Sequence, residues 1–187
     1  MSFPSDSTWV MTISGGDTFA LYVRDALGID TPTATSIPPL TPAVPRVDFD
    51  VPPSFGAEWD RWWVHTLGEG RLSGGIDDLP GRWPTGLPAG LRGAYSDWHD
   101  PRTPEATSRR DDARTNLGDS LRELVSELKE ELGHEPVFTL EMIQIPVKGQ
   151  FWRRLNTDTV LVSEELLLSR NIIAPLETVI RELAGAD

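Results

Sequence analysis

The clearest periodic pattern of hydrophobic residues lies in the last third of the chain. Apolar side chains recur every three or four residues from Leu121 to Leu132, and charged side chains fill most positions between them. This spacing predicts an amphipathic helix that begins at Asp119 or Ser120 and that Gly133 ends. Its inward positions are Leu121, Leu124, Val125, Leu128 and Leu132.

A sheet is predicted directly after this helix. Residues 137–147 are rich in β-forming side chains, and Lys148-Gly149 follows them as a turn. Residues 151–152 and 159–162 then predict one long strand or two short ones. We therefore expect a hairpin at this place in the chain.

Two further helices are predicted after the hairpin. Ser163 is placed to cap a short helix, and residues 172–183 repeat apolar side chains at helical spacing. Residues 117–187 are accordingly predicted to form a helix–hairpin–helix core.

The first residues predict a strand followed by an ambiguous segment. Trp9–Ile13 is apolar enough for a strand. Residues 18–27 fit a strand after a turn at Gly15-Gly16, but they also fit a helix capped by Asp17 and ended by Gly28. The Gly28 stop and the Arg24-Asp25-Ala26-Leu27 ending favour the helix.

A tryptophan-rich helix is predicted over residues 55–67. Ser54 is a candidate cap and Gly68 a terminator. Three indoles fall on one side of this helix because they are spaced by three and four residues. They belong to Trp59, Trp62 and Trp63.

A proline-dense tract, residues 29–53, separates these two elements. Proline lacks an amide donor and biases its predecessor towards extended backbone, so we expect an extended connector. Val47, Phe49 and Val51 alternate with polar residues along it. Such a tract fits a groove on its own domain or on a partner. A second segment, residues 68–116, lacks any sustained period and is predicted to be irregular.

Together these elements predict an α+β fold. We expect a small mixed or antiparallel sheet, with about four helices and long irregular segments rich in proline and glycine. A chain of 187 residues suits a single domain, 1–187.

Composition narrows the function classes. The chain has no cysteine, which excludes disulfides, thiolate zinc sites and a cysteine nucleophile. Its net charge of −12 argues against nucleic acid and favours a basic protein partner. Neither a signal peptide nor a membrane span is recognisable, so we expect a cytoplasmic protein and no membrane partner.

Asp97, His99 and Asp100 form the most enzyme-like string. A histidine held by a carboxylate can act as a general base, and Glu141 is a candidate to complete such a site. Adjacent residues rarely supply this geometry, because successive side chains point apart. The string therefore supports only an alternative hypothesis, a small hydrolase or transferase.

Metal and anion sites have weaker support. The three histidines show no helical ligand spacing, so no metal or other cofactor is predicted. Gly15 and Gly16 follow a strand and precede a candidate helix, which is the setting of an anion site. Asp17 places a carboxylate where the anion would bind, which favours a plain turn.

Seven tryptophans are the remaining anomaly, and five of them lie between residues 59 and 98. Tryptophan and arginine anchor many protein interfaces. We therefore predict a non-enzymatic protein-interaction module, such as an adaptor, an inhibitor or immunity-type component, or a subunit of a larger assembly. Its oligomeric state stays open. The candidate contact residues are Trp59, Trp62, Trp63, Trp83, Trp98, Trp152, Arg153 and Arg154.

Overall fold

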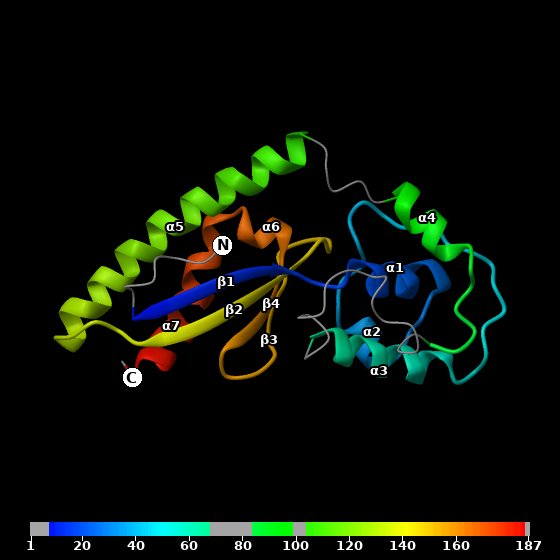
Figure 1. Ribbon diagram of the computed structural model, residues 1–187, viewed down its shortest axis with the longest axis horizontal. Helices are drawn as coiled ribbons and strands as arrows, with labels where there is room; N and C mark the ends of the chain where they lie inside the picture. Colours follow the sequence, from blue (N-terminus) through cyan, green and yellow to red (C-terminus); the bar gives the residue numbers. More distant parts are fainter. Residues whose placement is uncertain (1–7, 68–83, 99–103, 186–187) are drawn as a thin grey trace. The chain divides into compact units, whose positions relative to one another are not determined.

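The computed structural model describes residues 8–67, 84–98 and 104–185. In these ranges the chain forms seven α-helices and a four-stranded mixed sheet, which confirms the predicted α+β class (Figure 1). The predicted number of helices, about four, is too low. Contacts between Cα atoms divide the chain into two compact units. Unit 1 comprises residues 1–15, 101–145 and 149–187, and unit 2 comprises residues 16–100 and 146–148.

The sheet belongs to unit 1 and has the strand order β1-β2-β4-β3. Strands β1 (Trp9–Gly15), β2 (Phe138–Ile145) and β4 (Thr159–Ser163) are parallel, and β3 (Trp152–Arg154) runs antiparallel to β4. The predicted strand at 137–147 is β2, and residues 151–162 form two short strands rather than one long strand.

The expected pairing across the Lys148-Gly149 turn is wrong, because β4 lies between β2 and β3. Residues 146–148 leave the sheet and pair with the proline tract instead. Val147 forms an antiparallel bridge with Leu40, and the amide of Lys148 donates to the Pro39 carbonyl at 2.8 Å. The hairpin of this region is therefore β3–β4.

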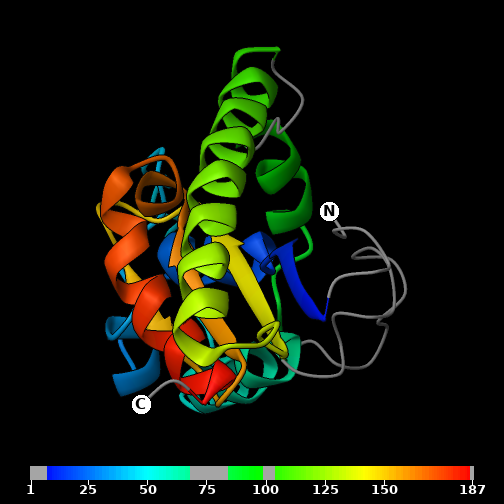
Figure 2. The same cartoon turned by 90° about the vertical axis from the view of Figure 1, so that its left-hand side faces the viewer.

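Four helical segments cover one face of the sheet in unit 1. They are α5 (Pro104–Leu132), α6 (Glu164–Leu167), the 3-10 helix η3 (Arg170–Ile172) and α7 (Ile173–Ala184). Figure 2 shows α5 and α7 side by side in front of the strands. The core they enclose contains Met11, Leu140, Met142, Val160 and Val162 from the sheet, and Leu121, Leu128, Leu176 and Ile180 from the helices.

Helix α5 corrects the prediction of irregular structure over 68–116. It begins at Pro104 rather than at Asp119 or Ser120, and residues 91–98 form a further helix, α4 (Leu91–Trp98). Proline is tolerated at the first helical position, where its missing amide would have no partner. The first half of α5 has no apolar period and mixes good helix formers, namely alanine, arginine and glutamate, with aspartate, serine and threonine. Residues 68–83 and 99–103 lie outside the described ranges.

Unit 2 is built around α1 (Thr18–Leu27), and both end signals of this helix are confirmed. The Asp17 carboxylate accepts a hydrogen bond from the Ala20 amide at 3.0 Å. Gly28 closes the helix at a φ of 71°, and its amide donates to the Arg24 carbonyl. The helix α3 (Phe55–Leu67) has the predicted bounds and packs against α1.

The proline tract is tied to α1 by a buried arginine. Arg24 is 3% exposed and pairs with the Asp25 carboxylate at 2.7 Å. It also donates to three carbonyl oxygens of the tract: those of Ala34 at 3.3 Å, Ile37 at 2.9 Å and Pro38 at 2.8 Å. The tract is not extended throughout, since α2 (Pro32–Thr35) forms one helical turn at its start.

None of the helices in the described ranges is both long enough and apolar enough to cross a membrane.

The Arg24 network predicts a large loss of stability on substitution. Arg24→Met keeps a long apolar side chain but removes the ion pair to Asp25, whose largely buried carboxylate retains the Leu40 amide as a donor, and leaves the three tract carbonyls without the guanidinium. We expect the free energy of unfolding to fall by about 3–5 kcal/mol. Urea unfolding followed by circular dichroism measures this loss.

Arg122→Met is the matched control, since Arg122 forms an exposed ion pair with Asp119 on α5. Loss of such a pair costs less than about 1 kcal/mol. Equal losses in the two variants would contradict the anchoring role of Arg24.

Candidate functional site

The residues assigned to catalysis do not converge in the described part of the chain. Asp97 is exposed near the end of α4, and His99 and Asp100 lie outside the described residues. Glu141 lies on β2 in unit 1, where its carboxylate accepts a hydrogen bond from Ser14 Oγ at 3.1 Å. Within the described ranges, no group of three or more acidic or histidine side chains could hold a metal ion.

Gly15 and Gly16, the weak candidates for an anion site, are followed by the Asp17 cap of α1. The Asp17 carboxylate occupies the helix N-terminus, where an anion would bind. Burial raises the pKa of Asp17, and hydrogen bonds from the amides of Ala20 and Phe19 offset part of this effect. The amides of α1 are thus partly satisfied by the chain's own carboxylate, which also repels anions.

Three of the predicted contact tryptophans are buried within unit 2. Trp59, Trp62 and Trp63 on α3 are at most 3% exposed. Trp59 and Trp63 stack with their ring centroids 6.0 Å apart, and the Trp59 indole donates to the Ala20 carbonyl at 2.7 Å. These indoles are packing residues, because no partner can reach them in the folded unit.

Trp98 also belongs to an internal cluster, and Trp83 lies outside the described residues. The Trp98 ring lies 5.4 Å from that of Tyr22 and 6.2 Å from that of Tyr95, measured between centroids. Tyr22 and Tyr95 are themselves 5.4 Å apart. Rings at these separations contact one another directly, so they leave no room for a ligand between them.

Trp152, Arg153 and Arg154 lie on β3 in unit 1. Trp152 is half-buried against the core, and the Arg153 guanidinium lies 5.4 Å from the centroid of the Phe151 ring. Arg154 donates to Glu182 and, at 2.8 Å, to the Thr157 carbonyl. The Arg154 side chain is therefore already engaged within unit 1.

The most exposed apolar residues of the proline tract were not among the predicted contacts. Phe49 is 50% exposed and Val47 is 41% exposed, and Asp48 and Asp50 flank Phe49. We call residues 47–51 the acidic arc. Their alternation was visible in the sequence, but only the structure shows that their own unit leaves Val47 and Phe49 uncovered.

The acidic arc is held at both ends. At its start, the Val47 amide donates to the Ala26 carbonyl at 2.9 Å. Glycine at position 28 leaves room for the Arg46 side chain. A Cβ at that position would lie 1.6 Å from Arg46 Nη1, so any larger residue there would push the Arg46 guanidinium away. At its end, Pro52 lies beside Gly86, and the Phe55 amide donates to the Pro52 carbonyl at 2.9 Å. The arc thus spans two fixed points of unit 2.

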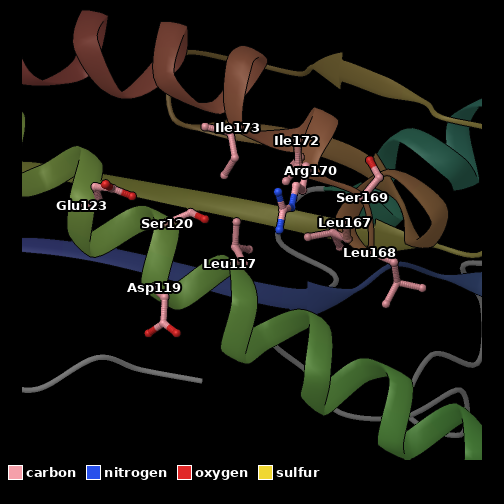
Figure 3. Close-up of a pocket in the computed structure, with 10 residues that line it drawn as sticks. All are labelled: Leu117, Asp119, Ser120, Glu123, Leu167, Leu168, Ser169, Arg170, Ile172 and Ile173. Atoms are coloured by element: carbon pink, nitrogen blue, oxygen red, sulfur yellow. The ribbon is translucent and has the colours of Figure 1, made fainter.

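A second candidate site is a cavity of about 540 Å³ in unit 1, between α5 and the segment from α6 to α7. Figure 3 shows the side chains that line it. Leu117, Leu167 and Ile172 give it apolar walls, and Arg170 is the cation among its lining residues. The sequence offered no signal for this cavity, since its walls come from segments some fifty residues apart.

Comparisons with protein families, with characterised proteins and with solved structures found no significant match to this chain.

The aromatic cluster of Tyr22, Tyr95 and Trp98 contains a tyrosine with a raised pKa. Burial, and secondly the negative charge of Asp17, raise the pKa of Tyr95 to about 12. The fold therefore favours the neutral phenol. The free energy of unfolding that this pKa shift contributes is fully present below about pH 10, the ordinary pKa of tyrosine. That contribution is lost as the pH rises through the folded-state pKa of about 12.

Asp17→Asn is expected to lower the Tyr95 pKa, because it removes the nearby charge while an amide oxygen still caps α1. Tyr22→Phe gives a background in which Tyr95 is the remaining tyrosine of the chain. Tyrosinate absorbance against pH measures the pKa, and circular dichroism at each pH follows the fold. Asp97→Asn is the control. A Tyr95 pKa that responds to neither substitution, or equally to both, would contradict the proximity of Asp17.

Proposed function

We propose that this protein is a non-enzymatic protein-interaction module whose contact surface is the acidic arc. Its partner is a protein with a basic strand or groove. The partner pairs with the extended backbone of the arc and takes Phe49 into an apolar pocket. The observation that carries this proposal is the exposure of Phe49 and Val47 between two anchored ends.

Exposed aromatic residues in a fixed backbone are suited to binding. A phenylalanine side chain gains about 1.5–3 kcal/mol when it is fully buried, and half of Phe49 is still open to solvent. Its neighbour Val47 lies two residues away, which places both side chains on the same side of an extended backbone. A partner therefore recovers apolar burial that unit 2 does not provide.

The backbone of the arc supports pairing with another strand. No amide or carbonyl of residues 48–51 forms a backbone hydrogen bond to another described residue. Pro45, Pro52 and Pro53 flank this stretch and restrict its conformations before binding. A restricted strand loses less entropy on association than a free peptide, which favours recognition by strand addition.

The charge of the arc favours a basic partner. Asp48 and Asp50 are both exposed and stand on either side of Phe49. The whole chain carries a net charge of −12, so a cationic surface is attracted before contact and an acidic one is repelled.

The catalytic alternative around residues 97–100 receives no comparable support. Asp97 is exposed on α4, and it is not among the residues that line the unit 1 cavity. We therefore do not carry that alternative forward.

Phe49→Ala is expected to weaken binding at least tenfold, in line with the cost of about 2 kcal/mol for removing an aromatic anchor of an interface. The protein and its variants are immobilised and exposed to lysate of the source cells. Proteins retained by the wild type are identified by mass spectrometry, and their affinities are then measured with purified components. Asp48→Asn with Asp50→Asn should weaken binding at low salt and reduce its salt dependence.

Val64→Ala is the matched control, because Val64 is 63% exposed but lies on α3 outside the arc. A retained protein counts in favour of the proposal only if it is basic, is lost with Phe49→Ala and is kept with Val64→Ala. Retention of the same proteins by both variants, or retention of acidic proteins alone, would refute it.

A further inference from the structure

The cavity of unit 1 combines apolar walls with one cation. Leu117 from α5 faces Leu167 and Ile172 from the segment after β4, and all three are largely buried. Figure 3 shows the Arg170 guanidinium and the Ser120 hydroxyl directed into the space between α5 and η3. The volume of about 540 Å³ lies within the range of small-molecule sites.

Arg170 is available to a ligand. It lies on η3 and is exposed, and its guanidinium forms no hydrogen bond or ion pair with another described residue. Two other arginines of unit 1 are already engaged: Arg154 pairs with Glu182, and Arg181 bridges Glu131 and Glu177. An uncommitted guanidinium beside apolar walls is suited to a carboxylate, which it binds through two parallel hydrogen bonds.

Two acidic residues also line the cavity and have unequal effects. Asp119 is paired with Arg122, and Figure 3 shows its carboxylate turned away from the space. Glu123 is exposed on α5, and its carboxylate forms no hydrogen bond or ion pair with another described residue. Glu123 therefore opposes an anionic ligand, whereas Arg170 attracts it.

We infer that this cavity binds an amphiphilic carboxylate, a molecule with one anionic head and an unbranched apolar tail. The head pairs with Arg170. The tail lies along Leu117, Leu167 and Ile172 towards Leu168, which is 43% exposed beside the cavity. This inference uses residues of unit 1 only and is independent of the acidic arc.

Isothermal titration calorimetry on the full chain tests the site with decanoate below its micelle concentration. Decanol and decyltrimethylammonium are the neutral and cationic probes of equal chain length. Decanoate is expected to bind about tenfold more tightly than decanol, because only the carboxylate forms an ion pair with the Arg170 guanidinium through two parallel hydrogen bonds. Octanoate should bind about fifteenfold more weakly than decanoate, because each of the two missing methylenes adds about fourfold in affinity when it is buried.

Two charge variants act in opposite directions. Arg170→Gln should remove the preference for decanoate over decanol, whereas Glu123→Gln should tighten decanoate binding a few-fold because it removes a nearby like charge. Both side chains are exposed, so neither change disturbs the core. Unaltered decanoate affinity in Arg170→Gln, or tighter binding of decyltrimethylammonium than of decanoate, would overturn the inference.

Ser120→Phe blocks the cavity from α5 and should abolish binding of decanoate and decanol alike. Circular dichroism and urea unfolding check that this variant is folded. If it is not, Leu168→Glu places a repelling charge beside the cavity at an exposed position and should weaken decanoate more than decanol. Normal decanoate binding by a folded blocking variant overturns the inference. It is also overturned if the wild type binds none of the three probes.

Discussion

The ion pair between the buried Arg24 and the largely buried Asp25 determines how unit 2 can fold. A proline tract supplies few amide donors and cannot pair its carbonyl groups in regular structure, yet buried carbonyls require partners. One guanidinium satisfies the carbonyls of Ala34, Ile37 and Pro38, and the Asp25 carboxylate accepts from the Leu40 amide at 2.7 Å. Most residues of helix α1 are buried, with α3 and α4 packed against the helix and the tract bound to Arg24.

The same attachment determines where the acidic arc begins. Once residues 34–40 are fixed to α1, the chain returns to the end of that helix, where the Ala26 carbonyl accepts from Val47. This bond uses a carbonyl near the helix C-terminus, where such groups lack helical partners. The chain then has only five residues to cover before Pro52 meets Gly86 and α3 begins at Phe55. In this short stretch, held at both ends, Val47 and Phe49 stay exposed whereas Val51 is half-buried.

Some of these structural features could be predicted from the sequence, and others could not, depending on whether an apolar period and end markers were present. Helix α3 was predicted at its observed bounds because an apolar period and markers at both ends agreed. The first half of α5 was missed because helix-forming residues without an apolar period leave no such signal. Burial of Trp59, Trp62 and Trp63 was not predictable, since an indole stripe on a helix suits a core and an interface equally. Phe49 carried a visible alternation, but whether its own unit covered it depended on contacts such as those of Arg24. The cavity walls at residues 117–123 and 167–173 could be joined only by the tertiary fold.

The two proposed contacts should respond to salt in opposite ways, and this follows from one property of the chain. The net charge of −12 produces a field that attracts the basic partner of the acidic arc over long range. Screening removes that attraction, so the partner's association rate should fall as salt increases. The same field repels an amphiphilic carboxylate, which gains only at short range from Arg170 and the apolar walls. Screening removes the repulsion and, as an excluded salt such as sulfate is added, strengthens apolar burial. Carboxylate binding should therefore be maintained or improved under conditions that weaken the protein contact, because one depends on the field of the whole molecule and the other on a single local cation.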